Sequence, residues 1–306
     1  MERKVIVIVG PTCSGKTRLG IALVLKLRTE IISADSRQIY RFLNVGTAKP
    51  SIDELNKVKH HFIDCCDPAE EYNVSRFETD ALKIINDLHA AGKIPVVVGG
   101  SGLYIKALVD GIFNTVDADE AYREELKVNR EKFGNEYLYN ELKKVDTQSA
   151  AKMLPQNWKR VMRALEVFHL TGEPIWKFHE SYSRDSELEF IQYGLNWDRK
   201  ILYQNIENRV DRMMKDGLEA EVKNLLSLGF GKKMNALNTV GYKEIISYLE
   251  NEITLERAIE LIKRNTRRFA KRQMTWFRKD QRINWLQITS ESDLEKASQI
   301  ILKDFC

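Results

Sequence analysis

The stretch GPTCSGKT, residues 10–17, contains the residue types that hold a chain of phosphates. It fits the pattern G-x-x-x-x-G-K-[S/T] in full, in which backbone N–H groups and the start of a helix surround phosphate oxygens. Lys16 would add a mobile positive charge, and the Thr17 hydroxyl is a ligand that Mg²⁺ accepts. The alternative is an ordinary turn between a strand and a helix. We expect a phosphate site made of Gly10, Pro11, Thr12, Cys13, Ser14, Gly15, Lys16 and Thr17, with Mg²⁺ at Thr17.

The chain does not repeat the other marks of enzymes that hydrolyse nucleoside triphosphates. Motor and switch proteins place an acid after a second apolar strand, where it holds the metal. Here the strongest such segment, PVVVGGS (95–101), ends without an acid, and no Asn-Lys-x-Asp sequence for reading guanine is found. This counts against a GTPase or a motor. It favours group transfer, with the donor's phosphates in the loop and an acceptor opposite.

Asp35 is the carboxylate best placed to act on that acceptor. It follows the apolar segment EIISA (30–34), and the carboxyl ends of parallel strands lie beside a phosphate loop. A carboxylate there could take a proton from an incoming nucleophile. The alternative is structural, since Asp followed by Ser is also a good helix N-cap. The polar loop GTAKP (46–50) could lie over the same site.

Residues 263–282 form a basic segment, with nine Lys or Arg residues and a single acid, Asp280. On a helix, Arg264, Arg268 and Arg272 form one row, and an adjacent row completes a broad cationic face. With so few acids in the segment, a polyanionic partner is favoured over a merely solvated surface. The aromatic residues of the segment would pack in the core or stack on bases; they are Phe269, Trp276 and Phe277.

A second basic cluster lies at residues 159–163. Two basic surfaces on separate parts of the chain favour an extended anionic acceptor such as RNA. Single-stranded RNA is usually read by stacking splayed bases, and an enzyme that acts on one base must extrude it.

An α/β framework would position these residues. The segments 4–9, 30–34, 94–98 and 190–195 predict strands, and their continuous apolar runs are typical of a parallel sheet covered on both faces. Helical patterns cover 16–27, 75–91, 199–228, 241–250 and 254–279. The predicted fold class is α/β, with a P-loop NTPase-like parallel sheet as its core.

The segment 115–187 differs because it contains no convincing strand. It has helical stretches at 119–133, 135–145 and 157–171, and it predicts a helical insertion domain. The core would then comprise residues 1–114 and 188–306, with a helical C-terminal part. The junctions would lie near 114–117 and 183–187.

Bulk composition bounds the class of protein. The net charge is +4 and hydrophobic residues make up 43%, as in globular proteins. The first residues are not those of a signal peptide and no stretch is long enough to span a membrane, so we expect a cytoplasmic protein. The four cysteines form no C-x-x-C pair, and the spacing of His60, His61, Cys65 and Cys66 fits no common zinc pattern. A structural or phosphate-side role is favoured for that segment.

Together these segments resemble the tRNA dimethylallyltransferase family, in its bacterial type. The resemblance spans most of the chain and rests on GPTCSGKT (10–17), SADSRQIYR (33–41), VGTAKP (45–50), HHFID (60–64), VVGGSGLYI (97–105), KRVMRALEV (159–167), IENRVDRM (206–213), GLEAEV (217–222), TVGYKE (239–244) and TRRFAKRQMTWFR (266–278). Ser101 stands where many relatives have threonine, which keeps the hydroxyl. No Cys/His finger follows the core, unlike in many eukaryotic members.

The resemblance implies transfer of a dimethylallyl group from dimethylallyl diphosphate to N6 of adenosine 37, in tRNAs that read codons beginning with U. Residues 12–17 would hold the pyrophosphate, with Mg²⁺ near Thr17, and Asp35 would be the general base on the amine. Ser101 would contact phosphate or tRNA, and Arg209 would neutralise the departing pyrophosphate.

The anticodon stem-loop is the implied partner. Its expected contacts, to which the basic face adds Arg268, are Asp35, Ser36, Arg37, Gln38, Ser101, Arg123, Lys159, Arg160, Val161, Met162, Arg163, Asn238, Thr239, Val240, Gly241, Tyr242 and Lys243.

Three other functions stay open at this point. One is a small-molecule P-loop kinase with Asp35 activating a hydroxyl, although the basic helix would then have no evident purpose. Another is an adenylate prenyltransferase, which should not need a surface for tRNA. The last is a non-catalytic RNA-binding ATPase module. A single phosphate site gives no need for a dimer, so we expect a monomer.

Overall fold

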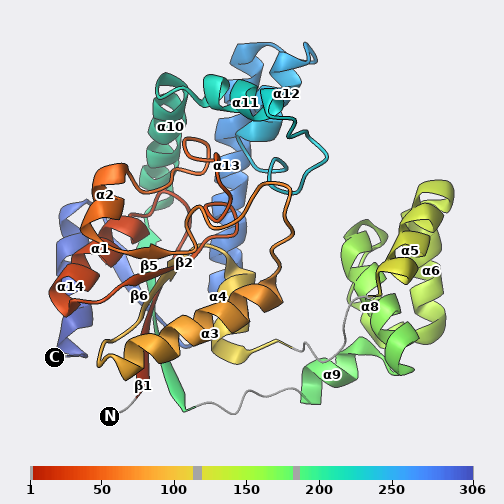
Figure 1. The fold of residues 1–306 in the computed structure, drawn as a ribbon, viewed down its shortest axis with the longest axis horizontal. Coiled ribbons are helices and arrows are strands. Elements are labelled where there is room, and N and C mark those ends of the chain that lie inside the picture. Colours follow the sequence, from red (N-terminus) through yellow and green to blue (C-terminus); the bar gives the residue numbers. More distant parts are fainter. Residues whose placement is uncertain (1–2, 113–118, 182–186, 306) are drawn as a thin grey trace. The chain divides into compact units, whose positions relative to one another are not determined.

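The structure, a computed structural model, describes residues 3–112, 119–181 and 187–305. Contacts between residues divide the chain into two compact units. The first comprises residues 1–109 and 187–306, and the second comprises residues 110–186. Figure 1 labels the helices and strands of both units.

The first unit is built on a parallel six-stranded sheet in the order β3-β2-β4-β1-β5-β6. Its strands are β1 Arg3–Val9, β2 Ile31–Ala34, β3 His60–His61, β4 Val96–Gly99, β5 Leu188–Trp197 and β6 Ile283–Ile288. The central strand β1 lies between β4 and β5, with Ile8 opposite both Val98 and Tyr193. This confirms the predicted α/β class and the parallel sheet.

Helices cover both faces of this sheet (Figure 1). They are α1 Lys16–Leu27, α2 Ile52–Lys57, α3 Val74–Ala90, α4 Gly102–Asp110, α10 Arg199–Lys215, α11 Leu218–Ser227, α12 Tyr242–Leu249, α13 Leu255–Phe277 and α14 Ser292–Lys303. Ile6 and Ile8 of β1 pack with α1 and α14 on one face. Val5 and Val7 pack with α3, α4 and α10 to α13 on the opposite face. The apolar run of β1 is therefore buried on both sides, as its sequence predicts.

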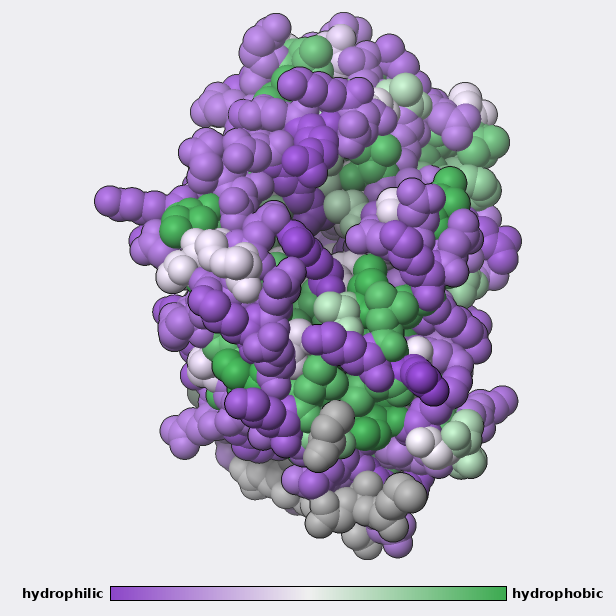
Figure 2. All heavy atoms as spheres, turned by 90° about the vertical axis from the view of Figure 1, so that its left-hand side faces the viewer, coloured by the Kyte–Doolittle hydropathy of each residue, from purple (hydrophilic) through white to green (hydrophobic). Residues whose placement is uncertain are grey.

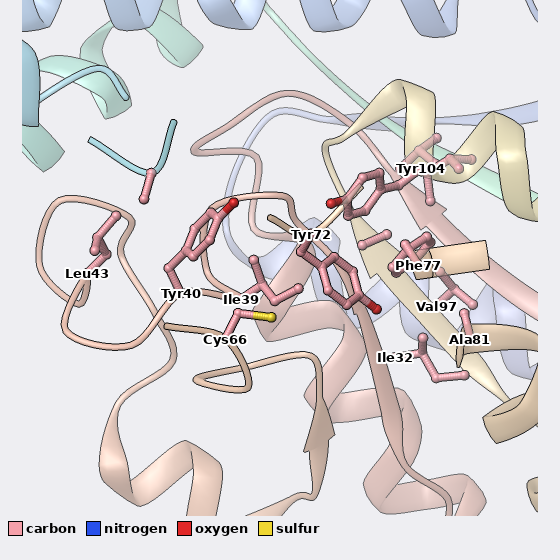
Figure 3. Packing of buried hydrophobic residues seen from close by; sticks show 14 of the residues in the cluster. Ile32, Ile39, Tyr40, Leu43, Cys66, Tyr72, Phe77, Ala81, Val97 and Tyr104 are labelled. Carbon is pink, nitrogen blue, oxygen red and sulfur yellow. The ribbon is translucent and has the colours of Figure 1, made fainter. Parts of the chain in front are cut away.

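The core on the second face reaches close to the ends of the strands. Phe77 of α3 stacks on Tyr104 of α4, with ring centroids 4.3 Å apart. Figure 3 shows these rings beside Ile32 and Val97 of the sheet. Tyr40 and Tyr72 belong to the same cluster. Tyr40 and Tyr104 therefore anchor in this core the segments that follow β2 and β4.

Most predicted elements of the first unit are confirmed, and α1 matches its predicted range at both ends. The predicted helix 199–228 is wrong as a single element, because Gly217 has a positive φ of 95° and separates α10 from α11. The sequence analysis did not predict β3, β6, α2, α4 or α14. The strand β3 has two residues, and β6 lies at the edge of the sheet with a half-exposed pattern, so neither has a strong apolar signature.

The described residues of the second unit form helices joined by short turns, with no strand among them. Its helices are α5 Glu120–Phe133, α6 Asn135–Val145, α7 Thr147–Ala151, α8 Trp158–Thr171 and α9 Ile175–Ser181, with a 3-10 turn at Pro155–Asn157. Leu126, Leu138, Leu142 and Leu165 form its core. The helices predicted at 119–133, 135–145 and 157–171 correspond to α5, α6 and α8. The junction predicted at 114–117 lies outside the described residues, as does 183–186 of the second junction.

The outer surface is polar over most of the face drawn in Figure 2, where hydrophobic side chains gather in smaller areas between hydrophilic ones. None of the helices that the structure describes has the length and apolar character that crossing a membrane requires.

Candidate active site

A cavity of about 980 Å³ lies at the carboxyl ends of β1, β2 and β4, where a parallel sheet is expected to bind ligands. Each of these strands continues into a segment of its wall: residues 12–18 after β1, 35–38 after β2 and 100–104 after β4. Residues of α10 and α13, of the segment before α12 and of the loop at 46–50 also line it, so the GTAKP loop lies at the site as expected. All lining residues belong to the first unit.

Most of the predicted site residues share this wall. They are Thr12, Cys13, Ser14, Gly15, Lys16, Thr17, Asp35, Ser36, Arg37, Gln38, Ser101, Arg209, Asn238, Thr239, Val240 and Lys243. The fold therefore joins segments that lie far apart in the sequence. Gly10, Pro11, Gly241, Tyr242 and Arg268 belong to the same unit but do not line the cavity.

The remaining predicted residues lie in the second unit, on α5 and α8. Arg123 and Arg163 both pair with the buried carboxylate of Glu166, at 2.6 and 2.5 Å. Val161 and Met162 are 0% and 7% exposed and pack in the core of this unit. Tyr242 of the first unit is also 0% exposed. These three side chains are buried and offer no surface to tRNA, which corrects the expectation that they contact it.

The loop at residues 10–17, called the phosphate loop for its sequence motif, contains residues with a positive φ. Gly15 has a φ of 84° immediately before α1, and Cys13 has a φ of 64°, which is unusual for a residue with a side chain. The indole of Trp197 donates to the Ser14 carbonyl at 3.0 Å. The Ser14 hydroxyl is buried and makes no hydrogen bond within the described residues. An unpartnered hydroxyl in this loop fits a site that a phosphate oxygen completes.

Positive charge is concentrated at the loop. The Lys16 ammonium donates to the Pro11 carbonyl at 2.6 Å. Burial lowers the pKa of Lys16 to about 8; nearby Asp35 opposes this shift and Arg209 adds to it. Because burial and a second cation both disfavour the charged form, the site is electrostatically prepared for an anion.

Arg209 of α10 reaches the same loop. Its Nη1 donates to the Thr12 hydroxyl at 3.0 Å and contacts the Cys13 sulfur at 3.6 Å. Its Nη2 donates to the carbonyl of Thr47 at 3.3 Å. These contacts hold the Arg209 guanidinium in place beside the phosphate loop.

Asp35 begins a turn rather than a helix. Its Oδ1 accepts the backbone N–H groups of Arg37 and Gln38, at 2.9 and 3.3 Å. The structural alternative of a helix N-cap is therefore wrong, since residues 36–39 form turns. Its other oxygen, Oδ2, accepts no hydrogen bond from any described residue and belongs to a residue that lines the cavity. That oxygen is free to accept a proton or a ligand.

Ser101 couples the ends of β2 and β4. Its hydroxyl accepts the Ser36 N–H at 2.9 Å and donates to the Ser36 hydroxyl at 3.3 Å. Its own N–H donates to the carbonyl of Ala34 at 3.2 Å. Ser101 thus fixes the segment that carries Asp35.

Gln273 of α13 is a site residue that the sequence analysis missed. It is 7% exposed, and its Oε1 accepts the Thr12 N–H at 2.8 Å while its Nε2 donates to the Gly100 carbonyl at 2.9 Å. It therefore joins the phosphate loop to the loop after β4. A signal was present, because positions 270, 273 and 277 share one buried stripe of an otherwise basic helix.

The basic face of α13 is partly neutralised by α10, which corrects the expectation of few pairing acids. Lys263 pairs with Asp211 at 2.6 Å, and Arg267 pairs with Glu207 at 2.5 Å. Arg268 is exposed and pairs with no carboxylate in the described part of the chain.

The three aromatic residues of α13 divide between core and cavity. Phe277 is buried, whereas Phe269 and Trp276 line the cavity. The guanidinium of Arg272 lies 5.8 Å from the centre of the Phe269 ring. The cavity wall therefore offers flat apolar surfaces next to cationic groups, which suits a planar, charged ligand.

The chain is similar to known proteins over most of its length. Residues 38–280 match the family model described as IPP transferase. A tRNA dimethylallyltransferase of Alkaliphilus oremlandii is 45% identical over 306 residues, which cover 100% of this chain and 98% of the relative. One of Carboxydothermus hydrogenoformans is also 45% identical, with 99% and 98% covered.

Solved structures agree. A tRNA isopentenylpyrophosphate transferase of Bacillus halodurans is 38% identical, with a TM-score of 0.72 and coverage of 98% of this chain and 96% of that one. A eukaryotic dimethylallyltransferase, studied in crystals while acting on tRNA, is 30% identical with a TM-score of 0.83. The match covers 99% of this chain and 79% of the eukaryotic one.

Proposed function

Since this chain belongs to the IPP transferase family, we propose that it transfers a dimethylallyl group from dimethylallyl diphosphate to N6 of adenosine 37 of tRNA. The tRNAs are those that read codons beginning with U, and the products are N6-isopentenyladenosine and pyrophosphate. One observation carries the proposal: a phosphate loop and a carboxylate with a free oxygen, Asp35, line the same cavity. The chain is a prenyl transferase rather than a kinase.

The loop would bind the diphosphate as a leaving group. As the bond between the allylic carbon and the diphosphate oxygen breaks, negative charge builds on the leaving oxygens. The loop N–H groups, the Lys16 ammonium and the Arg209 guanidinium would stabilise that charge, because they lie at the proposed diphosphate site before the reaction begins. The buried Ser14 hydroxyl would find its partner there.

The acceptor would be oriented from the other side of the cavity. The N6 amine is a weak nucleophile, and its lone pair must face the allylic carbon as the new C–N bond forms. Asp35 Oδ2 would accept one amine hydrogen bond and take the proton that the product loses. Ser101 and the Asx turn hold Asp35 in place for that step.

Mg²⁺ fits this site in part. The Thr17 hydroxyl is an oxygen donor of the kind that Mg²⁺ accepts, and Thr17 lines the cavity. Among the described residues, no group of three or more His, Cys, Asp or Glu side chains could hold a metal ion. The ion would therefore be held mainly by diphosphate and water, and it would supply charge neutralisation of the leaving group.

The tRNA would lie against the exposed, unpaired part of the basic face of α13. The second unit contributes its own basic residues, Lys159 and Arg160, to tRNA binding in this proposal. We further propose a monomer and a cytoplasmic location, where tRNA is found.

The proposal is tested by offering the protein alternative acceptors and donors. An unmodified tRNA, free AMP and no acceptor are each incubated with dimethylallyl diphosphate and Mg²⁺, and in parallel with ATP, and the products are weighed by mass spectrometry. Prenylated tRNA with unchanged AMP supports the proposal. Prenylated AMP beside unchanged tRNA would indicate an adenylate prenyltransferase, and phosphate transfer from ATP would indicate a kinase.

Binding of inorganic pyrophosphate is predicted to weaken as pH rises. Lys16 has a pKa of about 8 in the free protein, so it loses its charge above that pH, whereas a bound anion raises the pKa and keeps the proton. Affinity should therefore fall by up to about tenfold per pH unit above pH ~8, with uptake of a proton on binding. Calorimetry in buffers of different ionisation enthalpy measures both. In Lys16→Met the binding should be weaker and its pH dependence flatter. An unchanged slope in this variant would show that another group titrates.

Replacing Arg268 is predicted to weaken tRNA binding in a salt-dependent way. Arg268→Glu should lower affinity at low salt and reduce the slope of log affinity against log salt by about one. Arg268→Gln and Arg267→Gln form the matched pair, since each removes one positive charge; Arg267 is already paired with Glu207, so Arg267→Gln should change the slope less than Arg268→Gln. Filter binding or fluorescence anisotropy over a salt series measures the slope. Equal slopes in the Arg268 variant and the unaltered protein would mean that the face is only solvated.

A further inference from the structure

The loop at residues 44–48 is held by a carboxylate that the proposed mechanism does not use. Glu221 of α11 accepts three successive backbone N–H groups with its two oxygens. Oε2 accepts those of Asn44 and Val45 at 2.9 and 2.8 Å, and Oε1 accepts that of Gly46 at 3.1 Å. Successive N–H groups that converge in this way form a concavity that binds anions. Here the carboxylate of Glu221, from a helix far away in the sequence, occupies that concavity.

Tyr242 completes this arrangement. Its hydroxyl donates to Glu221 Oε1 at 2.6 Å, and the residue is fully buried. Burial and the neighbouring Glu221 charge raise the pKa of Tyr242, so the hydroxyl keeps its proton and remains a donor. Its ring lies directly on the loop, since a Cβ added to Gly46 would come within 2.4 Å of it. Only glycine fits at that position.

Two side chains that line the cavity, Arg209 and Gln38, are hydrogen-bonded to this loop. The carbonyl of Thr47 accepts Nη2 of Arg209 at 3.3 Å and Nε2 of Gln38 at 3.1 Å. Nε2 of Gln38 also donates to the carbonyl of Ala48 at 3.0 Å. Arg209 in turn reaches the phosphate loop through Thr12. Glu221 is therefore linked to the phosphate loop through the backbone of Gly46 and Thr47 and the two hydrogen bonds of Arg209, although Glu221 does not line the cavity.

We propose that Glu221 and Tyr242 are positioning residues for group transfer: they hold the loop at residues 44–48 so that the Thr47 carbonyl aims the Arg209 guanidinium at the leaving group. This inference rests on the function proposed above. A long arginine side chain would otherwise have to be ordered during the reaction. Fixing it beforehand removes that reorganisation from the barrier.

The inference predicts a loss of turnover that follows Arg209. Glu221→Gln retains the side-chain volume but replaces one acceptor oxygen with a donor NH₂, which repels the loop N–H groups. Turnover should fall by about 10- to 100-fold, with tRNA affinity unchanged. Tyr242→Phe removes a single hydrogen bond and should give a smaller loss. Glu219→Gln is the matched control on the same helix, because Glu219 pairs with Lys223 at the surface.

A double-mutant cycle with Arg209→Ala separates positioning from general stability. Transfer rate, melting temperature and affinity for inorganic pyrophosphate are measured for each single variant and the double variant. If Glu221 acts through Arg209, Glu221→Gln adds little to the loss already present in Arg209→Ala. Losses that multiply, or a fall in melting temperature with no change in rate, would overturn the inference.

The readouts also distinguish this inference from the proposed function. If the unaltered protein prenylates tRNA and Glu221→Gln matches it, the positioning role fails alone. If the unaltered protein makes no prenylated tRNA, the function fails, and the pyrophosphate arm still decides on Glu221. Pyrophosphate binding that Glu221→Gln weakens only when Arg209 is present would support positioning; equal weakening in its absence would contradict it.

Discussion

Asp35→Asn is expected to lower the turnover number by about 10²- to 10⁴-fold while leaving the affinity for tRNA almost unchanged. The amide oxygen of asparagine can still accept the N–H groups of Arg37 and Gln38, so the turn is kept. Asparagine carries an NH₂ group in place of the second oxygen, and its amide cannot take a proton from the amine, so the general base is lost. The loss should therefore appear in the chemical step, measured by single-turnover transfer with both substrates saturating.

Asp35→Ala is the comparison that separates the two roles of the carboxylate. It removes the base and also the acceptor of the turn, so any additional loss over Asp35→Asn reports the structural share. Turnover of Asp35→Asn close to that of the unaltered protein would remove Asp35 as the general base and leave it only the turn.

Arg209→Ala is expected to lower turnover by about 10²- to 10³-fold, as the loss of a donor directed at developing charge does in other enzymes. The guanidinium contacts Thr12, Cys13 and the Thr47 carbonyl together, which a planar fork can do and an ammonium cannot. Arg209→Lys should therefore recover only part of the rate. The rate of pyrophosphate release under single-turnover conditions is the measurement.

Chemical rescue provides the control for Arg209. Added guanidinium should restore part of the rate of Arg209→Ala and none of the rate of Asp35→Asn, because only the first variant leaves a gap of that shape. A wild-type rate in Arg209→Ala would contradict a role in stabilising the leaving group.

The sequence predicted the parts of the site that are local in the chain. The phosphate loop and α1 follow from one glycine-rich motif between an apolar run and a helical pattern, and both lie where that pattern places them. The position of Asp35 beside the loop follows from the parallel sheet alone. The class of the fold was predictable for the same reason, since continuous apolar strands require helices on both faces.

Contacts between distant segments could not be predicted in this way. The buried stripe of α13 could indicate that Gln273 is buried but not what it contacts, because its partners, the Thr12 N–H and the Gly100 carbonyl, are backbone groups. The same holds for Glu221, whose partners are three loop N–H groups. The acids that pair with α13 lie on α10, so the charge count of one segment overestimated its free charge.

The measurement that tests the central claim most directly follows both products of one reaction. An unmodified anticodon stem-loop with adenosines at positions 36, 37 and 38 is incubated with the protein, Mg²⁺ and dimethylallyl diphosphate. Released pyrophosphate is counted, and fragment mass spectrometry locates any added prenyl group. The account predicts one prenyl group on N6 of adenosine 37 for each pyrophosphate released. Pyrophosphate without prenylated RNA, or a prenyl group on another nucleotide, would contradict it.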